Sequence, residues 1–186
     1  KGVPASLLMA ICQTSLRHYV NKSRMPSAVL KKLNQDLEMR IREDMFITIF
    51  LATIDTQANT LTYARAGHES ALLAKAKKKG DLSIEKLHGS GMALGMVPSD
   101  LFEETIEDQT VPFETDDLLV LFTDGVTEAE NEEKEEFGID RLCETLSSST
   151  SSKANVFNRK LLSELDDYSS DSFERDDLTI VAVKRV

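Results

Sequence analysis

The sequence has only two cysteines, Cys12 and Cys143, and they lie far apart in stretches with helical apolar spacing. This pattern fits neither a disulfide framework nor a zinc site, which needs closely spaced ligands. A reducing compartment, the cytoplasm, fits it best. We expect both thiols to lie in the core, because unpaired cysteine usually packs as a small apolar side chain.

Long apolar runs are also absent. No stretch of the sequence approaches the roughly 20 apolar residues needed to cross a bilayer. The amino terminus has neither a basic segment nor a signal-peptide core. We therefore expect a soluble domain without a membrane segment of its own, while a membrane segment upstream of it stays open.

Basic residues are outnumbered by acidic ones. The chain has 22 Lys and Arg against 32 Asp and Glu, a net charge of −10. Such a surface argues against nucleic-acid binding, which requires clustered basic side chains. With 41% hydrophobic residues in 186, the sequence is too apolar for a disordered chain and predicts a single domain over residues 1–186. Clusters of acidic residues are better suited to cations.

Apolar periodicity predicts helices first, then strands, then helices and a last strand. Helical spacing covers residues 6–19, 27–41, 139–146 and 154–165. Strands are predicted at residues 45–54, 60–66, 70–74, 82–87, 102–111, 118–122 and 178–183. This order predicts an α+β domain of mostly antiparallel, hairpin-connected strands, not a parallel βαβ fold.

Acidic residues adjoin two of the most apolar predicted strands. Asp124 follows the strand 118–122 and precedes Gly125, which permits a tight turn, and Asp176 and Asp177 precede the last strand. If those strands are neighbours, the carboxylates converge at one sheet edge, where Mg²⁺ or Mn²⁺ would relieve their repulsion. The spacing by itself favours an ordinary turn at Asp124 and a cap at Asp176 over a metal site.

The segments around these acids resemble a known family. The motifs are LFTDGVTEA at residues 121–129, EFG at 136–138 and DDLT at 176–179, with further matches KGVPA at 1–5 and AGH at 66–68. In this order they resemble the bacterial SpoIIE/RsbU branch of the metal-dependent PPM (protein phosphatase 2C) family. The resemblance extends over nearly the whole chain.

The resemblance implies an α-β-β-α sandwich of two mostly antiparallel sheets flanked by helices, with two Mn²⁺ or Mg²⁺ ions at one edge. Asp124 and Asp176 would be metal ligands, while Gly125 and Asp177 would orient them. Thr127 and Glu128 would support the turn. The reaction would be hydrolysis of phosphoserine or phosphothreonine by a water molecule that the ions activate, without a side-chain nucleophile.

The sequence departs from the resemblance in two respects. Relatives have two acidic metal-binding motifs before the KGVPA segment, and this sequence begins after them. We therefore expect weak metal binding and little activity of the chain by itself, and an open sheet edge that a homodimer would cover. Arg65 stands where relatives usually have Asn before Ala-Gly-His, and His68 would either contact substrate or close a turn.

The resemblance also implies partners. Phosphatase domains of this branch commonly follow sensor domains in the same chain, and their substrate is a phosphorylated STAS-type regulatory protein, an anti-sigma-factor antagonist. The alternative, from a different functional class, is a catalytically inactive phosphatase-like module that binds a partner or dimerises in a signalling protein. Acids in the upstream sequence would distinguish the two.

Overall fold

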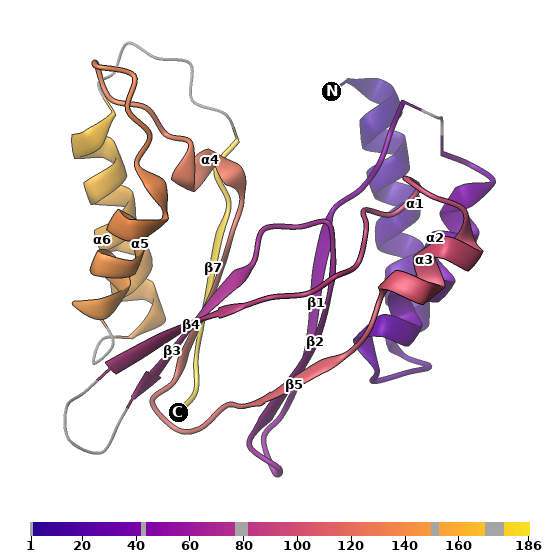
Figure 1. Cartoon of the computed structure of the whole chain (residues 1–186), viewed down its shortest axis with the longest axis horizontal. Coiled ribbons are helices and arrows are strands. Elements are labelled where there is room, and N and C mark those ends of the chain that lie inside the picture. Colours follow the sequence, from indigo (N-terminus) through magenta and orange to yellow (C-terminus); the bar gives the residue numbers. More distant parts are fainter. Residues whose placement is uncertain (1, 42–43, 77–81, 150–152, 170–176) are drawn as a thin grey trace. The chain divides into compact units, whose positions relative to one another are not determined.

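The computed structural model describes residues 2–41, 44–76, 82–149, 153–169 and 177–186 (Figure 1). Its elements in chain order are α1 (Val3–Val20), α2 (Pro26–Glu38), β1 (Ile49–Asp55), β2 (Thr60–Ala66), β3 (Ala71–Ala76), β4 (Leu82–Leu87), α3 (Ser99–Thr105), β5 (Gln109–Pro112), β6 (Leu118–Phe122), α4 (Asp124–Thr127), α5 (Gly138–Ser147), α6 (Ala154–Tyr168) and β7 (Ile180–Lys184). The chain forms two compact units, Lys1–His68 with His88–Pro112, and Glu69–Leu87 with Phe113–Val186.

Unit 1, the first of these, contains a three-stranded antiparallel sheet in the order β1-β2-β5. β1 and β2 form a hairpin in which Ile49 pairs with Ala66 and Asp55 pairs with Thr60. Alternate residues of β2 point to opposite faces of the sheet, so Ala64 and Ala66 pack on one side with apolar residues of α1, α2 and α3. Figure 1 shows these helices beside the sheet.

Helix α2 is fixed in unit 1 by its apolar stripe and by a distant cap. Leu30, Leu33 and Leu37 repeat at helical spacing and are fully buried. At the start of the helix, the backbone N–H of Ser27 donates to one carboxylate oxygen of Asp108 (2.8 Å), and its hydroxyl donates to the other (2.5 Å). Asp108 thus satisfies an N–H group that the first turn leaves unpaired.

The predicted strand at residues 102–111 is wrong in its first half. Residues Ser99–Thr105 form helix α3, and only Gln109–Pro112 are a strand, β5. Phe102 and Ile106 are four residues apart and both are buried among the apolar residues of α1 and α2. Burial against other helices therefore decides the conformation of a segment whose β-branched and aromatic residues favour a strand.

Unit 2, the second, contains a four-stranded antiparallel sheet in the order β4-β3-β6-β7. The strand predicted at residues 118–122 is confirmed without a shift as β6. Leu118, Val120 and Phe122 lie on one face of it and share a core with Phe157 and Leu161 of α6, which, with α5, covers this face. The α+β class with two antiparallel sheets and flanking helices is confirmed.

Candidate metal site at the end of strand β6

Asp124 lies where the central strand of unit 2 ends in a single helical turn. Strand β6 ends at Phe122, and α4 begins at Asp124. The carbonyl of Asp124 accepts hydrogen bonds from the backbone N–H of Glu128 (2.8 Å) and from the hydroxyl of Thr127 (3.2 Å). Val126 is fully buried and anchors the turn in the core. Thr127 and Glu128 therefore support the turn, as the resemblance implied.

The carboxylate of Asp124 is exposed and accepts one hydrogen bond from the described residues. Its Oδ1 accepts a hydrogen bond from the backbone N–H of Gly125 at 2.9 Å. Its Oδ2 has no hydrogen-bond partner among the residues that the structure describes. Gly125 thus orients the carboxylate while leaving oxygen lone pairs free for a cation.

The start of β7 lies beside this turn. β6 and β7 pair in antiparallel register up to Phe122 and Ile180. Beyond that pair, the backbone N–H of Thr123 donates to the carbonyl of Thr179 (3.1 Å), and the hydroxyl of Thr123 donates to the carbonyl of Asp177 (3.3 Å). β6 and β7 are therefore neighbours, as the expectation required, and their chains stay side by side as far as Thr123 and Asp177. The convergence of the carboxylates stays a prediction. Asp176 lies outside the described residues.

The described residues supply part of a metal site. Carboxylate oxygens are the ligands that Mg²⁺ and Mn²⁺ prefer, and Asp124 presents them to solvent at a fixed turn. Within the described ranges, no three His, Cys, Asp or Glu side chains are close enough to hold an ion together. Asp124 fits the role of one ligand, and a complete set requires oxygen atoms from outside these ranges.

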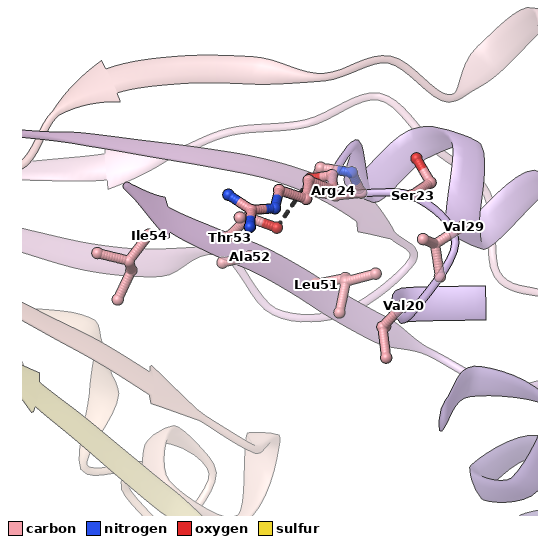
Figure 2. Close-up of a pocket in the computed structure, with 9 residues that line it drawn as sticks. Val20, Ser23, Arg24, Val29, Leu51, Ala52, Thr53 and Ile54 are labelled. Atoms are coloured by element: carbon pink, nitrogen blue, oxygen red, sulfur yellow. Dashed lines mark hydrogen bonds between the residues drawn. The ribbon is translucent and has the colours of Figure 1, made fainter. Parts of the chain in front are cut away.

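A pocket of about 390 Å³ lies in unit 1, away from the predicted site residues in sequence. Figure 2 shows it between Val20, Val29 and Leu51 on one side and the stretch from Ser23 to Arg24 and Thr53 on the other. The hydroxyl of Thr53 donates to the carbonyl of Arg24 at 2.9 Å, which ties β1 to the turn between α1 and α2.

Comparison with known proteins decides the family. The family model described as Stage II sporulation protein E (SpoIIE) matches residues 1–186. The chain belongs to the SpoIIE family. Among curated SpoIIE-type relatives, it is 36% identical to the phosphoserine phosphatase RsbU of Bacillus subtilis over 132 residues, which are 71% of this chain and 37% of RsbU. It is 34% identical to the protein IcfG of Synechocystis over 141 residues, which are 76% of this chain and 21% of IcfG.

Solved structures show the same fold. The SiaA-PP2C domain of Pseudomonas aeruginosa matches 98% of this SpoIIE-family chain and 71% of that domain, with 22% identity and a TM-score of 0.82. The PP2C phosphatase domain of SpoIIE from Bacillus subtilis, solved with part of its regulatory domain, matches 99% of this chain and 51% of that one, with 19% identity and a TM-score of 0.75. The PPM phosphatase fold is thereby confirmed.

The chain spans 37% and 21% of the length of these two curated SpoIIE-type relatives. It therefore corresponds to one part of each of them. Across the described residues, no helix is both long enough and apolar enough to cross a membrane.

Proposed function

We propose that this chain is the phosphatase part of a metal-dependent protein serine/threonine phosphatase that hydrolyses phosphoserine or phosphothreonine on a regulatory protein. The observation that carries the proposal is the exposed Asp124 carboxylate, held at the end of β6, where Thr123 bonds to Asp177 and Thr179 just before β7. The SpoIIE family and the phosphoserine phosphatase RsbU, with 36% identity, support the same reaction.

In this proposal the acidic residues hold cations. Asp124 and Asp176 bind Mn²⁺ or Mg²⁺, with the N–H of Gly125 orienting Asp124 and Asp177 orienting its neighbour. The ions, when bound, supply Lewis acidity and a water molecule of lowered pKa. The reaction breaks the phosphorus–oxygen bond of the monoester, gives the serine or threonine hydroxyl and inorganic phosphate, and consumes one water. Thr123, through its bonds to Thr179 and Asp177, fixes the spacing of the acidic segments.

The regulatory protein that we propose as substrate is a phosphorylated STAS-type anti-sigma-factor antagonist. We further propose that sensor domains in the same polypeptide control the reaction and that it takes place in the cytoplasm. The similarity to RsbU supports the first point. The small share of the curated relatives that this chain spans supports the second.

A catalytically inactive binding or dimerisation module is the second candidate. It is favoured by one observation, the lack of a complete ligand set among the described residues. In such a module Asp124 would be only the first residue of a turn.

The experiment that separates the two candidates is Mn²⁺-dependent release of phosphate from a phosphoserine protein. The chain is assayed alone and together with any residues that precede Lys1 in the full gene product. Asp124→Asn is the matched variant, because the amide keeps an oxygen for the N–H of Gly125 and loses the charge that binds the cation. The proposal predicts turnover that Asp124→Asn abolishes. Partner binding without phosphate release at any Mn²⁺ concentration would establish the inactive module instead.

A further inference from the structure

Arg65, in strand β2 of unit 1, uses only part of its hydrogen-bonding capacity. Its Nε donates to the carbonyl of His68, and its Nη1 donates to the carbonyl of Gly89 at 2.9 Å. A guanidinium group carries five N–H donors in a planar fork. The remaining three have no partner among the described residues.

The charge of Arg65 is also unbalanced. The side chain is half-buried, and no carboxylate of the described chain forms an ion pair with it, although the sequence carries a net charge of −10. Withdrawing a charge from water without a counter-charge is unfavourable. An anion beside Arg65 would remove that penalty.

The loop at residues 89–91 passes close to Arg65. A Cβ atom at Gly89 would lie 2.8 Å from Cβ of Arg65, and one at Gly91 would lie 2.3 Å from the carbonyl oxygen of Arg65. Only glycine permits so close an approach. Within the part of the chain described, the backbone N–H groups of Gly89 and Ser90 donate no hydrogen bond.

The loop is held in this position from two sides. The hydroxyl of Tyr63 donates to the carbonyl of His88 at 2.9 Å, and the backbone N–H of Gly67 donates to the carbonyl of Gly91 at 2.8 Å. The hydroxyl of Ser90 is turned away, toward the carbonyl of Thr105 at 2.8 Å. The carbonyls of His88, Gly89 and Gly91 are therefore occupied, while the N–H donors of Gly89 and Ser90 remain available.

We propose that Arg65 and the loop 89–91 form a binding site, within unit 1, for a phosphate-class oxyanion, either free phosphate or the phosphoryl group of a phosphorylated side chain. The guanidinium supplies charge and a planar fork that matches two oxygens of a phosphate. The N–H groups of Gly89 and Ser90 supply further donors. The anion site rests on Arg65 and the loop and is argued independently of the metal site at Asp124.

The test is amide chemical shifts of the full chain, recorded without divalent metal so that no turnover occurs. Inorganic phosphate, a phosphoserine peptide and the same peptide with unmodified serine are titrated at constant ionic strength. The variant is Arg65→Gln, whose amide retains two N–H donors for the carbonyls of His68 and Gly89 and loses the charge. The matched control is Arg24→Gln, because Arg24 is an exposed arginine of the same unit that lies away from the loop 89–91 in sequence and whose charge acts on Asp55 instead.

We expect phosphate and the phosphoserine peptide to shift the amides of Gly89 and Ser90 in the wild-type chain and in Arg24→Gln. In Arg65→Gln, binding should weaken by about tenfold, as for the loss of one charged hydrogen bond. If the amide shifts in Arg65→Gln equal those of the wild type, or if the wild type shows none, the anion site is overturned. Arg65 then serves only to hydrogen-bond the carbonyls of His68 and Gly89. If the spectrum of Arg65→Gln shows that this variant is unfolded, Arg65→Lys is used instead. Lysine keeps the charge but lacks the planar fork, so this variant must bind the anion more weakly than the wild type does.

Two further outcomes separate this site from the proposed function. Shifts with both inorganic phosphate and the phosphoserine peptide would support a site that takes a phosphorylated side chain, whereas shifts with inorganic phosphate alone would identify free phosphate as the anion. Asp124→Asn should bind both anions as the wild type does, because the Arg65 site contains no metal ligand. Loss of turnover in that variant therefore tests the metal site, and retained anion binding tests Arg65 independently of it.

Discussion

Thr123 and Thr179 are joined by a reciprocal pair of hydrogen bonds. The backbone N–H of Thr123 donates to the carbonyl of Thr179 at 3.1 Å, and the backbone N–H of Thr179 donates to the hydroxyl oxygen of Thr123 at 3.0 Å. The second bond uses a side chain where the ladder of β6 and β7 has ended. One hydroxyl group therefore continues the pairing of the two strands as far as Asp124 and Asp177.

Replacing Thr123 by valine should loosen this edge of the sheet. Valine has the shape of threonine without its hydroxyl, so the N–H of Thr179 and the carbonyl of Asp177 lose their side-chain partner. We expect a loss of about 1 kcal/mol in the free energy of unfolding, measured by urea denaturation. Thr123→Ser, which retains the oxygen, should lose less. A larger loss in Thr123→Ser than in Thr123→Val would show that the methyl group, not the hydroxyl, stabilises the turn.

Gly91→Ala should be the more damaging of two glycine substitutions. The added methyl group would lie 2.3 Å from the carbonyl oxygen of Arg65 and 2.3 Å from Cδ1 of Ile106, so the backbone must shift. We expect a loss of about 1–3 kcal/mol in thermal or urea unfolding.

Gly138→Ala is the comparison for that substitution. A Cβ at Gly138 meets nothing within 4 Å, but its φ of +76° strains any other residue, which costs about 1–2 kcal/mol. In Gly91→Ala the amide shifts of the loop 89–91 should also change, whereas in Gly138→Ala they should not. Unchanged loop shifts in Gly91→Ala would contradict the close approach of the loop to β2.

The pair of Tyr19 and Asp36 should stabilise unit 1 in a pH-dependent way. The hydroxyl of Tyr19 donates to Oδ2 of Asp36 at 2.8 Å and joins α1 to α2. This hydrogen bond, chiefly, raises the pKa of Tyr19 above its ordinary value of about 10. A raised folded-state pKa means that the contribution is complete below pH 10 and is lost as the pH rises through the folded value.

Tyr19→Phe tests this relationship. We expect the variant to be less stable than the wild type by up to about 1 kcal/mol at pH 7, because the pair is partly exposed. The difference should shrink toward zero above pH 10. Ser15→Ala, which removes the longer bond of 3.2 Å to the same carboxylate, should show no such pH dependence near 10. A difference between Tyr19→Phe and wild type that is constant over this range would refute the role of the phenol proton.

The two cysteines should differ in reactivity toward a disulfide reagent. Cys12 is 3% exposed, and burial raises the pKa of its thiol. Cys143 is partly exposed; burial, and then the nearby charge of Asp140, raise the pKa of its thiol. Because the thiolate is the reactive form, both should react more slowly in the folded chain than after denaturation.

Cys12 should be the slower of the two, reacting only as fast as the folded chain opens. Cys12→Ser and Cys143→Ser assign the two kinetic phases. Reaction of Cys12 at the rate of an unfolded thiol would contradict its place in the core of unit 1.

The turn at Asp124 could be predicted from the sequence because its determinants are local. Five consecutive apolar residues define β6, and an Asp-Gly pair follows within two residues. The sequence could not predict that β6 and β7 are neighbours, because their pairing joins residues more than fifty positions apart. It could only predict what would follow if they were. The structure confirms that condition at Phe122 and Ile180.

Other features depend on tertiary contacts and have no local signal. Helix α3 forms where the sequence favours a strand, because Phe102 and Ile106 are buried by helices that precede them by more than sixty residues. The hydrogen bonds from Arg65 to the carbonyls of His68 and Gly89 depend on the conformations of two loops. The only hint in the sequence was that Arg65 departs from the residue usual in relatives.

The division of unit 1 into two chain segments has a consequence for synthesis on the ribosome. β5 completes the sheet by pairing with β2, yet the β3–β4 hairpin of unit 2 is translated between them. The native sheet of unit 1 therefore cannot close until Pro112 has left the exit tunnel, whereas the β1–β2 hairpin can form as soon as Ala66 emerges. During that interval β2 offers an unpaired edge, the state in which a nascent chain most needs protection from neighbouring strands.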